Sequence, residues 1–339
     1  MIFSFLTQEL AIDLGTANTV IFMNDKKIID EPSIVAVDNL TGKVLAVGTK
    51  AKQMQGKESK GVRTIRPLKE GVIADFDSSE QMIREFIKMI NTRRSFFSPS
   101  LKMVVCIPSG STPVETRAVR DAAEHSGGRG VYLIFEPMAA ALGVGIDVTA
   151  PSGNMIVDIG GGTTEIAVIS LGGIVADSSI KVAGDQFTNE IQQYMRQQHN
   201  IKIGEKTAEE IKINIGAATS DLDEPIEPYK VSGPNLMTVL PIETTVTPQE
   251  IAHCLDKSLV RIESAIMSVL EQTPPELYSD IVHKGIYLTG GGALLRGLDK
   301  RLFKKINIPF HVAEDPLRAV ARGTCIALKN SNSFNFLMR

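Results

Sequence analysis

Two short segments of this sequence pair an aspartate with a glycine turn, a combination that suits a phosphorylated ligand. Each segment follows an apolar run, at residues 10–12 and 155–157, and each leads into a second run rich in β-branched residues. A glycine turn between two strands points several backbone N–H groups into one concavity, and such a nest binds phosphate. Glycine is needed there because a Cβ would obstruct the close approach and disfavour positive φ. The predicted phosphate-binding residues are Gly15, Thr16, Ala17 and Asn18 in the first turn, and Gly160, Gly161, Gly162 and Thr163 in the second.

Asp13 and Asp158 stand immediately before these turns. A carboxylate repels phosphate, so neither aspartate is expected to contact the phosphate directly. We expect them to hold Mg²⁺ through its waters, because magnesium keeps much of its hydration and is shared between carboxylates and phosphates. One such turn is weak evidence on its own. Two in register, about 145 residues apart, with a third glycine turn at residues 290–292, argue against coincidence.

Other signatures of function are absent from the sequence. It contains no G-x-x-x-x-G-K-[ST] phosphate loop, no dinucleotide fingerprint after the first strand and no G-x-S-x-G nucleophile elbow. Its histidines and cysteines do not cluster with metal-ligand spacing, and Cys106, Cys254 and Cys325 are expected to be reduced thiols of a cytoplasmic protein. The net charge of −3 argues against general nucleic-acid binding, so no nucleic-acid partner is expected. No run approaches the ~20 apolar residues that span a bilayer.

Strands and helices are predicted to alternate along the chain, which favours α/β architecture. Ser78 and Gln81 form an expected capping box before a helix that carries apolar residues at helical spacing. We expect residues 331–339, which are mostly polar, to be frayed. Residues 50–69 are rich in lysine and arginine and are interpreted as a solvated basic loop. Further helices are predicted at 113–126, 137–143, 185–198, 207–218, 248–271, 294–304 and 316–329, and further strands at 103–107, 131–135, 166–170, 174–178, 226–232, 235–242 and 286–289.

Five segments resemble, in the same order, the motifs of the actin, heat-shock chaperone and sugar kinase superfamily. They match its first phosphate loop, first connecting helix, second phosphate loop, adenosine loop and second connecting helix, at residues 12–18, 136–143, 158–165, 288–293 and 319–323. Residues 13–19, 136–141 and 204–212 resemble one branch more closely, the MreB family of bacterial actins that set rod shape. The resemblance covers residues 9–329.

The resemblance implies an actin-like ATPase fold, with two similar domains, each a mixed sheet flanked by helices, and the nucleotide in the cleft between them. Domain I would comprise residues 1–145 plus 320–339, and domain II residues 146–319. The small subdomains IB and IIB would span residues 32–71 and 181–245.

The resemblance also implies roles for single residues. Glu136 would position or polarise the attacking water, and Thr163 would assist it. Glu209 and Lys212 would contact the ribose and adenine, and their i, i+3 spacing puts both on one helix face. From the residues alone, Glu136 could equally be a favourable charge in a first helical turn, and the Glu209–Lys212 pair a surface pair. The adenosine loop would comprise Gly290, Gly291, Gly292 and Ala293.

The implied function is ATP binding and hydrolysis, with Mg²⁺, coupled to assembly of the chain into filaments that organise cell-wall synthesis and maintain rod shape. The implied partners are further copies of the chain in paired protofilaments, the inner face of the cytoplasmic membrane, and MreC, MreD and RodZ. A close MreB paralogue or a nucleotide-dependent scaffold with little turnover stays open. A small-molecule kinase would need a sugar pocket and an acidic base, and neither is recognisable. A chaperone ATPase would need a peptide-binding domain.

Two apolar elements are expected to contact the membrane, which would place the protein in the cytoplasm, peripheral to the inner face. Arginines beside the second element favour anionic lipid. The alternative is that both elements pack onto their own domain. The residues concerned are Ile2, Phe3, Phe5 and Leu6 in the first element, and Phe96 and Phe97 in the second.

Overall fold

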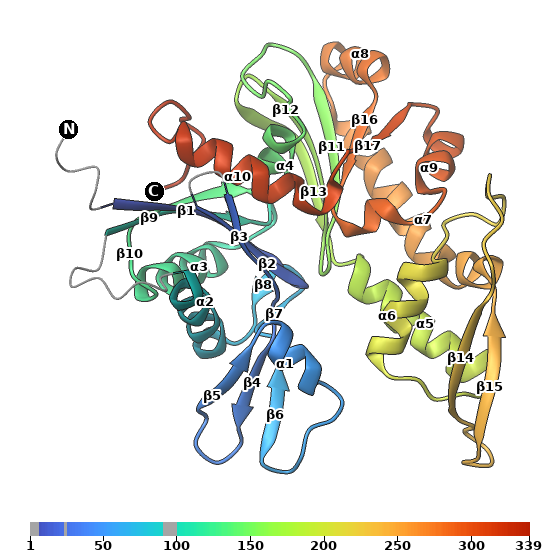
Figure 1. Ribbon diagram of the computed structural model, residues 1–339. Helices are drawn as coiled ribbons and strands as arrows, with labels where there is room; N and C mark the ends of the chain where they lie inside the picture. Colours follow the sequence, from blue (N-terminus) through green and yellow to red (C-terminus); the bar gives the residue numbers. More distant parts are fainter. Residues whose placement is uncertain (1–6, 24–25, 91–99) are drawn as a thin grey trace.

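The computed structural model describes residues 7–23, 26–90 and 100–339, which fold around two five-stranded sheets (Figure 1). The first sheet has the order β3-β2-β1-β9-β10. Its central strand β1 is antiparallel to β2 and parallel to β9, and β9 is parallel to β10. The strands are β1 (Thr7–Leu14), β2 (Asn18–Met23), β3 (Lys26–Pro32), β9 (Ser100–Ile107) and β10 (Gly128–Phe135).

The second sheet repeats this topology strand by strand. Its order is β13-β12-β11-β16-β17, with β11 antiparallel to β12 and parallel to β16, and β16 parallel to β17. The strands are β11 (Asn154–Ile159), β12 (Thr164–Ser170), β13 (Gly173–Ile180), β16 (Ile286–Thr289) and β17 (Phe310–Val312). The two similar halves that the family resemblance implies are therefore present in the fold, and the predicted α/β class is confirmed.

Two helices, α4 (Glu136–Gly143) and α10 (Ala319–Lys329), lie between the sheets and cross at very short range (Figure 1). A Cβ added at Gly143 would lie 2.7 Å from the carbonyl carbon of Ala319 and still closer to its oxygen. A Cβ added at Gly323 would overlap the carbonyl oxygen of Ala139 in the same way. Glycine at both positions lets the two backbones touch. The apolar cluster around this crossing takes residues from both sheets, such as Ala11 and Ile156.

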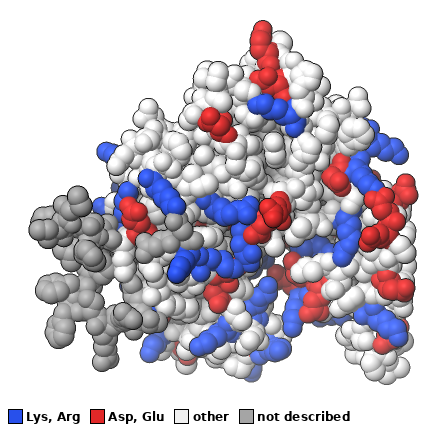
Figure 2. Space-filling model, turned by 45° about the horizontal axis from the view of Figure 1, so that its top comes forward, with Lys and Arg blue, Asp and Glu red and all other residues white. Residues whose placement is uncertain are grey.

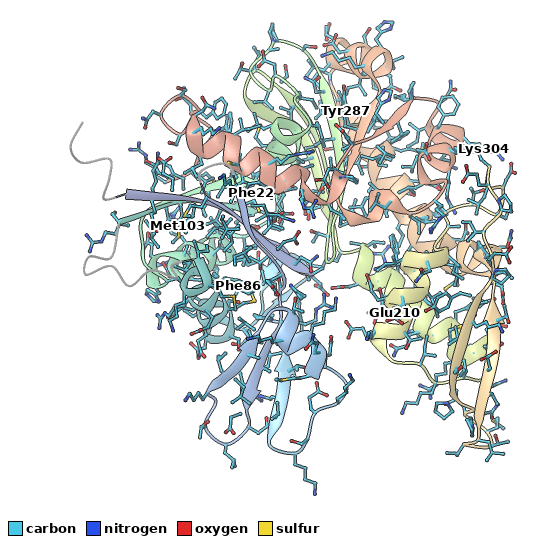
Figure 3. All side chains as sticks on the ribbon, viewed as in Figure 1. Phe22, Phe86, Met103, Glu210, Tyr287 and Lys304 are labelled. Atoms are coloured by element: carbon cyan, nitrogen blue, oxygen red, sulfur yellow. The ribbon has the colours of Figure 1, made fainter. Side chains whose placement is uncertain are left out.

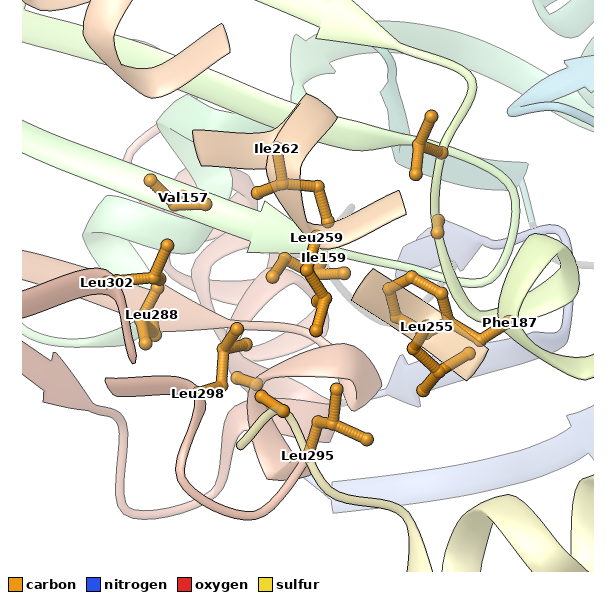
Figure 4. Packing of buried hydrophobic residues seen from close by; sticks show 14 of the residues in the cluster. Val157, Ile159, Phe187, Leu255, Leu259, Ile262, Leu288, Leu295, Leu298 and Leu302 are labelled. Carbon is orange, nitrogen blue, oxygen red and sulfur yellow. The ribbon is translucent and has the colours of Figure 1, made fainter. Parts of the chain in front are cut away.

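Each sheet has its own core on the face away from this crossing. Phe86 of α2 (Phe76–Ile90) and Met103 of β9 are fully buried in the first core (Figure 3). In the second core, Val157 of β11 lies among leucines and isoleucines that α7 (Pro248–Gln272) contributes (Figure 4). The remaining helices around the sheets are α3 (Pro113–His125), α8 (Pro275–Lys284) and α9 (Leu298–Ile306), with 3-10 turns η2 (Gly291–Leu294) and η3 (Pro316–Arg318).

Two smaller lobes extend from the same end of the sheets (Figure 1). The first small lobe consists of the sheet β5-β4-β6, helix α1 and the hairpin β7–β8. The second consists of α5, α6 and the hairpin β14–β15. Their bounds are β4 (Val35–Asp38), β5 (Val44–Val47), α1 (Thr49–Met54), β6 (Val62–Ile65), β7 (Leu68–Lys69), β8 (Val72–Ile73), α5 (Gly184–Gln198), α6 (Glu205–Ile215), β14 (Tyr229–Pro234) and β15 (Pro241–Val246). Lysine and arginine are interspersed with acidic side chains on the face shown in Figure 2.

Several local predictions are wrong. The capping box at Ser78 does not form, because the helix begins at Phe76 and Asp75 Oδ1 accepts a hydrogen bond from Ser78 N at 2.9 Å. The strands predicted at 226–232 and 235–242 lie a few residues later, because Asn235 Oδ1 accepts from the next turn's N–H groups and places the reversal there. The helix predicted at 294–304 begins only at Leu298, after Gly297 in the left-handed conformation. Helix α8 was not predicted.

The C-terminal segment is ordered, not frayed. Leu133 of β10 and Met338 exchange two backbone hydrogen bonds, at 2.9 and 3.0 Å. The rings of Phe334 and Phe336 stack with centroids 4.7 Å apart. The segment therefore covers part of the edge of the first sheet. The prediction of a frayed end rested on the polar residues of the segment, whereas its apolar residues pack against the protein.

Candidate functional site

The first glycine turn, residues 15–17, joins β1 to β2 and is fixed by one buried serine. A Cβ on Gly15 would lie 2.7 Å from the carbonyl oxygen of Asn18, so only glycine fits. Ser33 donates from Oγ to the carbonyl oxygen of Gly15 at 2.6 Å and from N to that of Ala17 at 2.9 Å. Because Ser33 bonds the carbonyl oxygens of both Gly15 and Ala17, the turn keeps a fixed shape. Ser33 was not predicted, because a serine after a proline carries no distinctive signal.

The second glycine turn, residues 160–163, joins β11 to β12. Gly160 N donates to the carbonyl oxygen of Thr163 at 2.9 Å, which closes the turn. The backbone N–H groups of Gly184 and Asp185, at the start of α5, donate to the carbonyls of Gly160 and Gly161 at 3.1 and 2.8 Å. The helix therefore holds the turn from one side.

The two turns face each other across the junction of the sheets. A Cβ on Gly161 would lie 2.8 Å from Ala17 Cβ, and one on Gly162 would lie 2.6 Å from Thr16 Oγ1. Thr16 Oγ1 in turn accepts from Gly71 N at 3.0 Å. Two segments about 145 residues apart in sequence thus lie against each other.

Three carboxyl groups beside the turns have strongly raised pKa values. Burial raises the pKa of Asp13 to about 6 and that of Asp158 to about 7. Burial, followed by the charges of Glu165, Asp158 and Asp13, raises the pKa of Glu136 well above its usual value. Like charges in a low dielectric favour the protonated form, and a bound cation would reverse that preference.

The donor set fits a hydrated magnesium ion. Among the residues that the structure describes, no three His, Cys, Asp or Glu side chains are arranged to hold a metal ion by themselves. Asp13 and Asp158 are the penultimate residues of β1 and β11, the central strands of the two sheets, and the charge of Asp13 contributes to the raised pKa of Asp158. Two carboxylates with waters and ligand phosphates make a suitable shell for Mg²⁺. The pair therefore stays the predicted magnesium site.

Glu165 joins the two halves of the site and was given no role from the sequence. Its fully buried carboxylate accepts from Ser109 N and Oγ, at 3.0 and 2.9 Å, and from Ser179 Oγ at 2.6 Å. Ser109 follows the first sheet and Ser179 belongs to the second. Burial raises the pKa of Glu165, and these hydrogen bonds oppose that rise. A glutamate inside an otherwise apolar strand was the signal that could have found it.

Glu209 and Lys212 lie together on α6, facing α5. Lys212 Nζ donates to Glu209 Oε2 at 2.7 Å, to Thr188 Oγ1 at 3.0 Å and to the carbonyl oxygen of Gly184 at 2.9 Å. Because Gly184 also bonds the second glycine turn, this pair is anchored next to the predicted phosphate site. It is not the loose surface pair that the residues alone would suggest. The predicted contact with a nucleoside stays a prediction.

The third glycine turn packs on the end of β11. Gly290 has φ 79°, and a Cβ there would overlap the carbonyl oxygen of Ile159. A Cβ on Gly292 would overlap the side chain of Ile159. Gly291 and Ala293 continue the 3-10 turn η2, where Ala293 is buried. The structure thus brings all three glycine turns to one region.

The predicted membrane-contacting residues, Ile2, Phe3, Phe5, Leu6, Phe96 and Phe97, lie outside the described residues. Within the ranges that the structure covers, no helix is both long and apolar enough to cross a membrane.

Comparison with known proteins assigns the family. Residues 7–335 match the model of the MreB/Mbl protein family. The chain belongs to the MreB/Mbl family. It is 49% identical over 328 residues to the cell shape-determining protein MreB of Escherichia coli K12, covering 95% of this chain and 94% of that protein. It is 48% identical over 324 residues to the cell shape-determining protein Mbl of Bacillus subtilis 168, covering 95% of this chain and 96% of that protein.

A solved member of the family has the same fold. The crystal structure of MreB 5 of Spiroplasma citri bound to AMPPNP superposes with a TM-score of 0.90 at 36% identity, covering 96% of this chain and 97% of that one. The predicted actin-like fold is thereby confirmed. The family match also speaks against the small-molecule kinase and the chaperone ATPase.

Proposed function

We propose that this chain binds ATP with Mg²⁺ between its first two glycine turns. The observation that carries the proposal is their direct opposition, with Gly161 facing Ala17 and an aspartate at the base of each turn. Backbone N–H groups of both turns would cradle the phosphates. Asp13 and Asp158 would hold Mg²⁺ through waters, and the ion would neutralise phosphate charge. The Spiroplasma citri relative, whose structure was solved bound to AMPPNP, supports nucleotide binding by this chain.

Hydrolysis is the second part of the proposal. Glu136 is the first residue of α4 and lies near Asp13, Asp158 and Glu165. A carboxylate with a raised pKa accepts a proton more readily, which suits a group that orients and polarises water. Thr163, which hydrogen-bonds Glu165, would assist in holding that water. Phosphoryl transfer needs such positioning more than covalent chemistry.

The third part is assembly. We propose that nucleotide binding and hydrolysis control polymerisation into membrane-associated filaments, in paired protofilaments, that organise wall synthesis and maintain rod shape with MreC, MreD and RodZ. The names of the relatives, cell shape-determining proteins, support this role. Residues 1–145 plus 320–339 would move as domain I against residues 146–319 as domain II. The chain is nearly equally similar to an MreB and to an Mbl, at 49% and 48% identity.

Electron microscopy of the purified chain on lipid, with and without ATP, tests assembly, and phosphate release from the same sample tests hydrolysis. Filaments that need ATP and release phosphate are expected. ATP-dependent filaments without phosphate release would favour the alternative, a scaffold with little turnover. A chain that neither binds ATP nor assembles would contradict the proposal.

A further inference from the structure

Arg66 joins three segments that are far apart in the sequence. It lies between β6 and β7, in the basic stretch expected to be a solvated loop, but only a quarter of its side chain is exposed. Its Nη2 lies 3.0 Å from Asp185 Oδ1, and its Nη1 lies 3.1 Å from Glu205 Oε1. Nη2 also donates to the carbonyl oxygen of Thr16 at 3.4 Å. One guanidinium therefore ties the first small lobe to the second small lobe and to the first glycine turn.

Each partner of Arg66 belongs to an element that shapes the site. Asp185 stands at the start of α5, and its N–H bonds the carbonyl of Gly161 in the second glycine turn. Glu205 is the first residue of α6, the helix that carries Glu209 and Lys212. Arg66 thus contacts, directly or through one residue, both turns that face the phosphates and the helix expected to face the nucleoside.

The contact has the features of a specific link. The guanidinium presents a planar fork of fixed geometry, so each of its two terminal nitrogens can serve one carboxylate, whereas a lysine ammonium is a single point charge on a flexible stem. Gln55 of the same lobe donates from Nε2 to Glu205 Oε2 at 3.1 Å, so Glu205 is held from two sides. A second ion pair between the halves, Lys181 with Glu70, has side chains 66% and 57% exposed, so it is expected to contribute little.

We propose that Arg66 is a positioning residue that clasps the two small lobes together over a bound nucleotide and slows its release. The inference rests on the proposed nucleotide binding. The lobes flank the turns, so their separation would widen the path by which a nucleotide held there leaves, and separation breaks both ion pairs of Arg66. The same clasp holds α6 at a fixed distance from the first glycine turn, so it favours the arrangement in which phosphate and nucleoside contacts are made together.

The clasp is tested by the rate at which nucleotide is released. The full chain is preloaded with a fluorescent ADP and Mg²⁺, and excess unlabelled ATP is then added. For Arg66→Gln, release should be about 5- to 20-fold faster, with a smaller change in the rate of binding. Arg66→Lys should be intermediate. Raising the salt concentration should speed release from the wild type more than from Arg66→Gln, since salt screens the ion pairs. Lys181→Gln is the matched control and should change release less than twofold.

Glu205→Gln tests the clasp from the other lobe and is informative even if Arg66→Gln fails to fold. Alone it should speed release severalfold, and in the Arg66→Gln background it should add little, because the two residues act as one link. Unchanged release from Glu205→Gln and from folded Arg66→Gln, or an equal acceleration by Lys181→Gln, overturns the clasp while the nucleotide site stands. Failure of the wild type to bind the labelled nucleotide overturns the proposed function and the clasp with it.

Discussion

Thr289 Oγ1 donates a hydrogen bond to Asp158 Oδ1 at 2.7 Å, between directly paired residues of the parallel strands β11 and β16. Both side chains are buried. This hydrogen bond lowers the pKa of Asp158, but burial outweighs it, and the pKa is raised from 3.8 to about 7. In the absence of nucleotide and Mg²⁺, a charge on Asp158 therefore destabilises the folded protein at neutral pH.

The direction of the pH dependence follows from that shift. Between about pH 4 and pH 7 the folded state keeps a proton on Asp158 that the unfolded chain has lost. The folded state binds more protons, so the free energy of unfolding falls as the pH rises through this window. At pH 8 the whole penalty remains, and a neutral side chain of the same shape would remove it.

Asp158→Asn should therefore stabilise the nucleotide-free, magnesium-free protein at pH 8 by on the order of 2–4 kcal/mol. Urea unfolding at pH 5 and pH 8 measures this, and the gain should shrink at pH 5. Asp147→Asn is the control, because Asp147 is exposed and hydrogen bonds from Thr149 lower its pKa. Loss of stability in Asp158→Asn at pH 8 would show that the buried carboxylate is compensated by interactions of its own.

The sequence predicts the parts of this site that depend on local backbone chemistry. Glycine turns after apolar strands have few alternative structures, so the turns around Gly15 and Gly161 could be placed without coordinates. Ser33, Arg66 and Glu165 could not, because most of their hydrogen-bond partners lie 14 to 139 residues away and single polar residues carry no periodic signal. The strands of the hairpin β14–β15 were predicted a few residues too early, because the position of the turn depends on the Asn235 side chain. Helix α8 was not predicted, because it is short and follows directly after α7 and before β16 in the sequence.

Gly161→Val tests the phosphate site. Valine would place a branched side chain against Ala17, whose Cβ would already lie 2.8 Å from the first carbon added. Affinity for ATP should fall at least 100-fold in equilibrium dialysis, since the close approach of phosphate to the backbone is lost. The far-ultraviolet circular dichroism spectrum is expected to stay native. Normal ATP affinity with a native spectrum would refute the assignment of this turn.

Glu136→Ala separates binding from hydrolysis. ATP affinity should change little, whereas the rate of phosphate release should fall by about 10²–10⁴-fold, the usual cost of losing a positioned acid–base group. Glu115→Ala is a control at another helix start, because Glu115 completes the capping box of α3 with Thr112. Turnover close to the wild-type rate in Glu136→Ala would mean that Glu136 is only a favourable charge in the first turn of α4.

Membrane contact is predicted from residues outside the described part of the chain. Deletion of residues 2–6 combined with Phe96→Ser and Phe97→Ser should release filaments from anionic liposomes without stopping ATP hydrolysis. Each apolar element alone gives marginal binding, and a filament multiplies the contacts. Wild-type filaments should co-sediment with liposomes, and monomers should bind poorly. Undiminished co-sedimentation of the variant would assign these residues to the protein core.

Gly323→Ala tests the crossing of α4 and α10. In most helices this substitution stabilises by up to about 1 kcal/mol, because alanine has the higher helix propensity. Here the added Cβ would lie 2.5 Å from the carbonyl carbon of Ala139 and closer to its oxygen, so the helices must separate. We expect a net loss of about 1–3 kcal/mol in the free energy of unfolding.

The matched control for this substitution is Gly61→Ala, since nothing lies within 4 Å of a Cβ at Gly61. That variant should be neutral or slightly stabilised in the same urea titration. Because α4 begins at Glu136, moving α4 away from α10 also moves the carboxylate proposed to orient water. Gly323→Ala should therefore slow phosphate release as well as destabilise the fold. If both glycine variants unfold alike and hydrolyse ATP alike, the two helices can separate freely, and their crossing does not fix the position of Glu136.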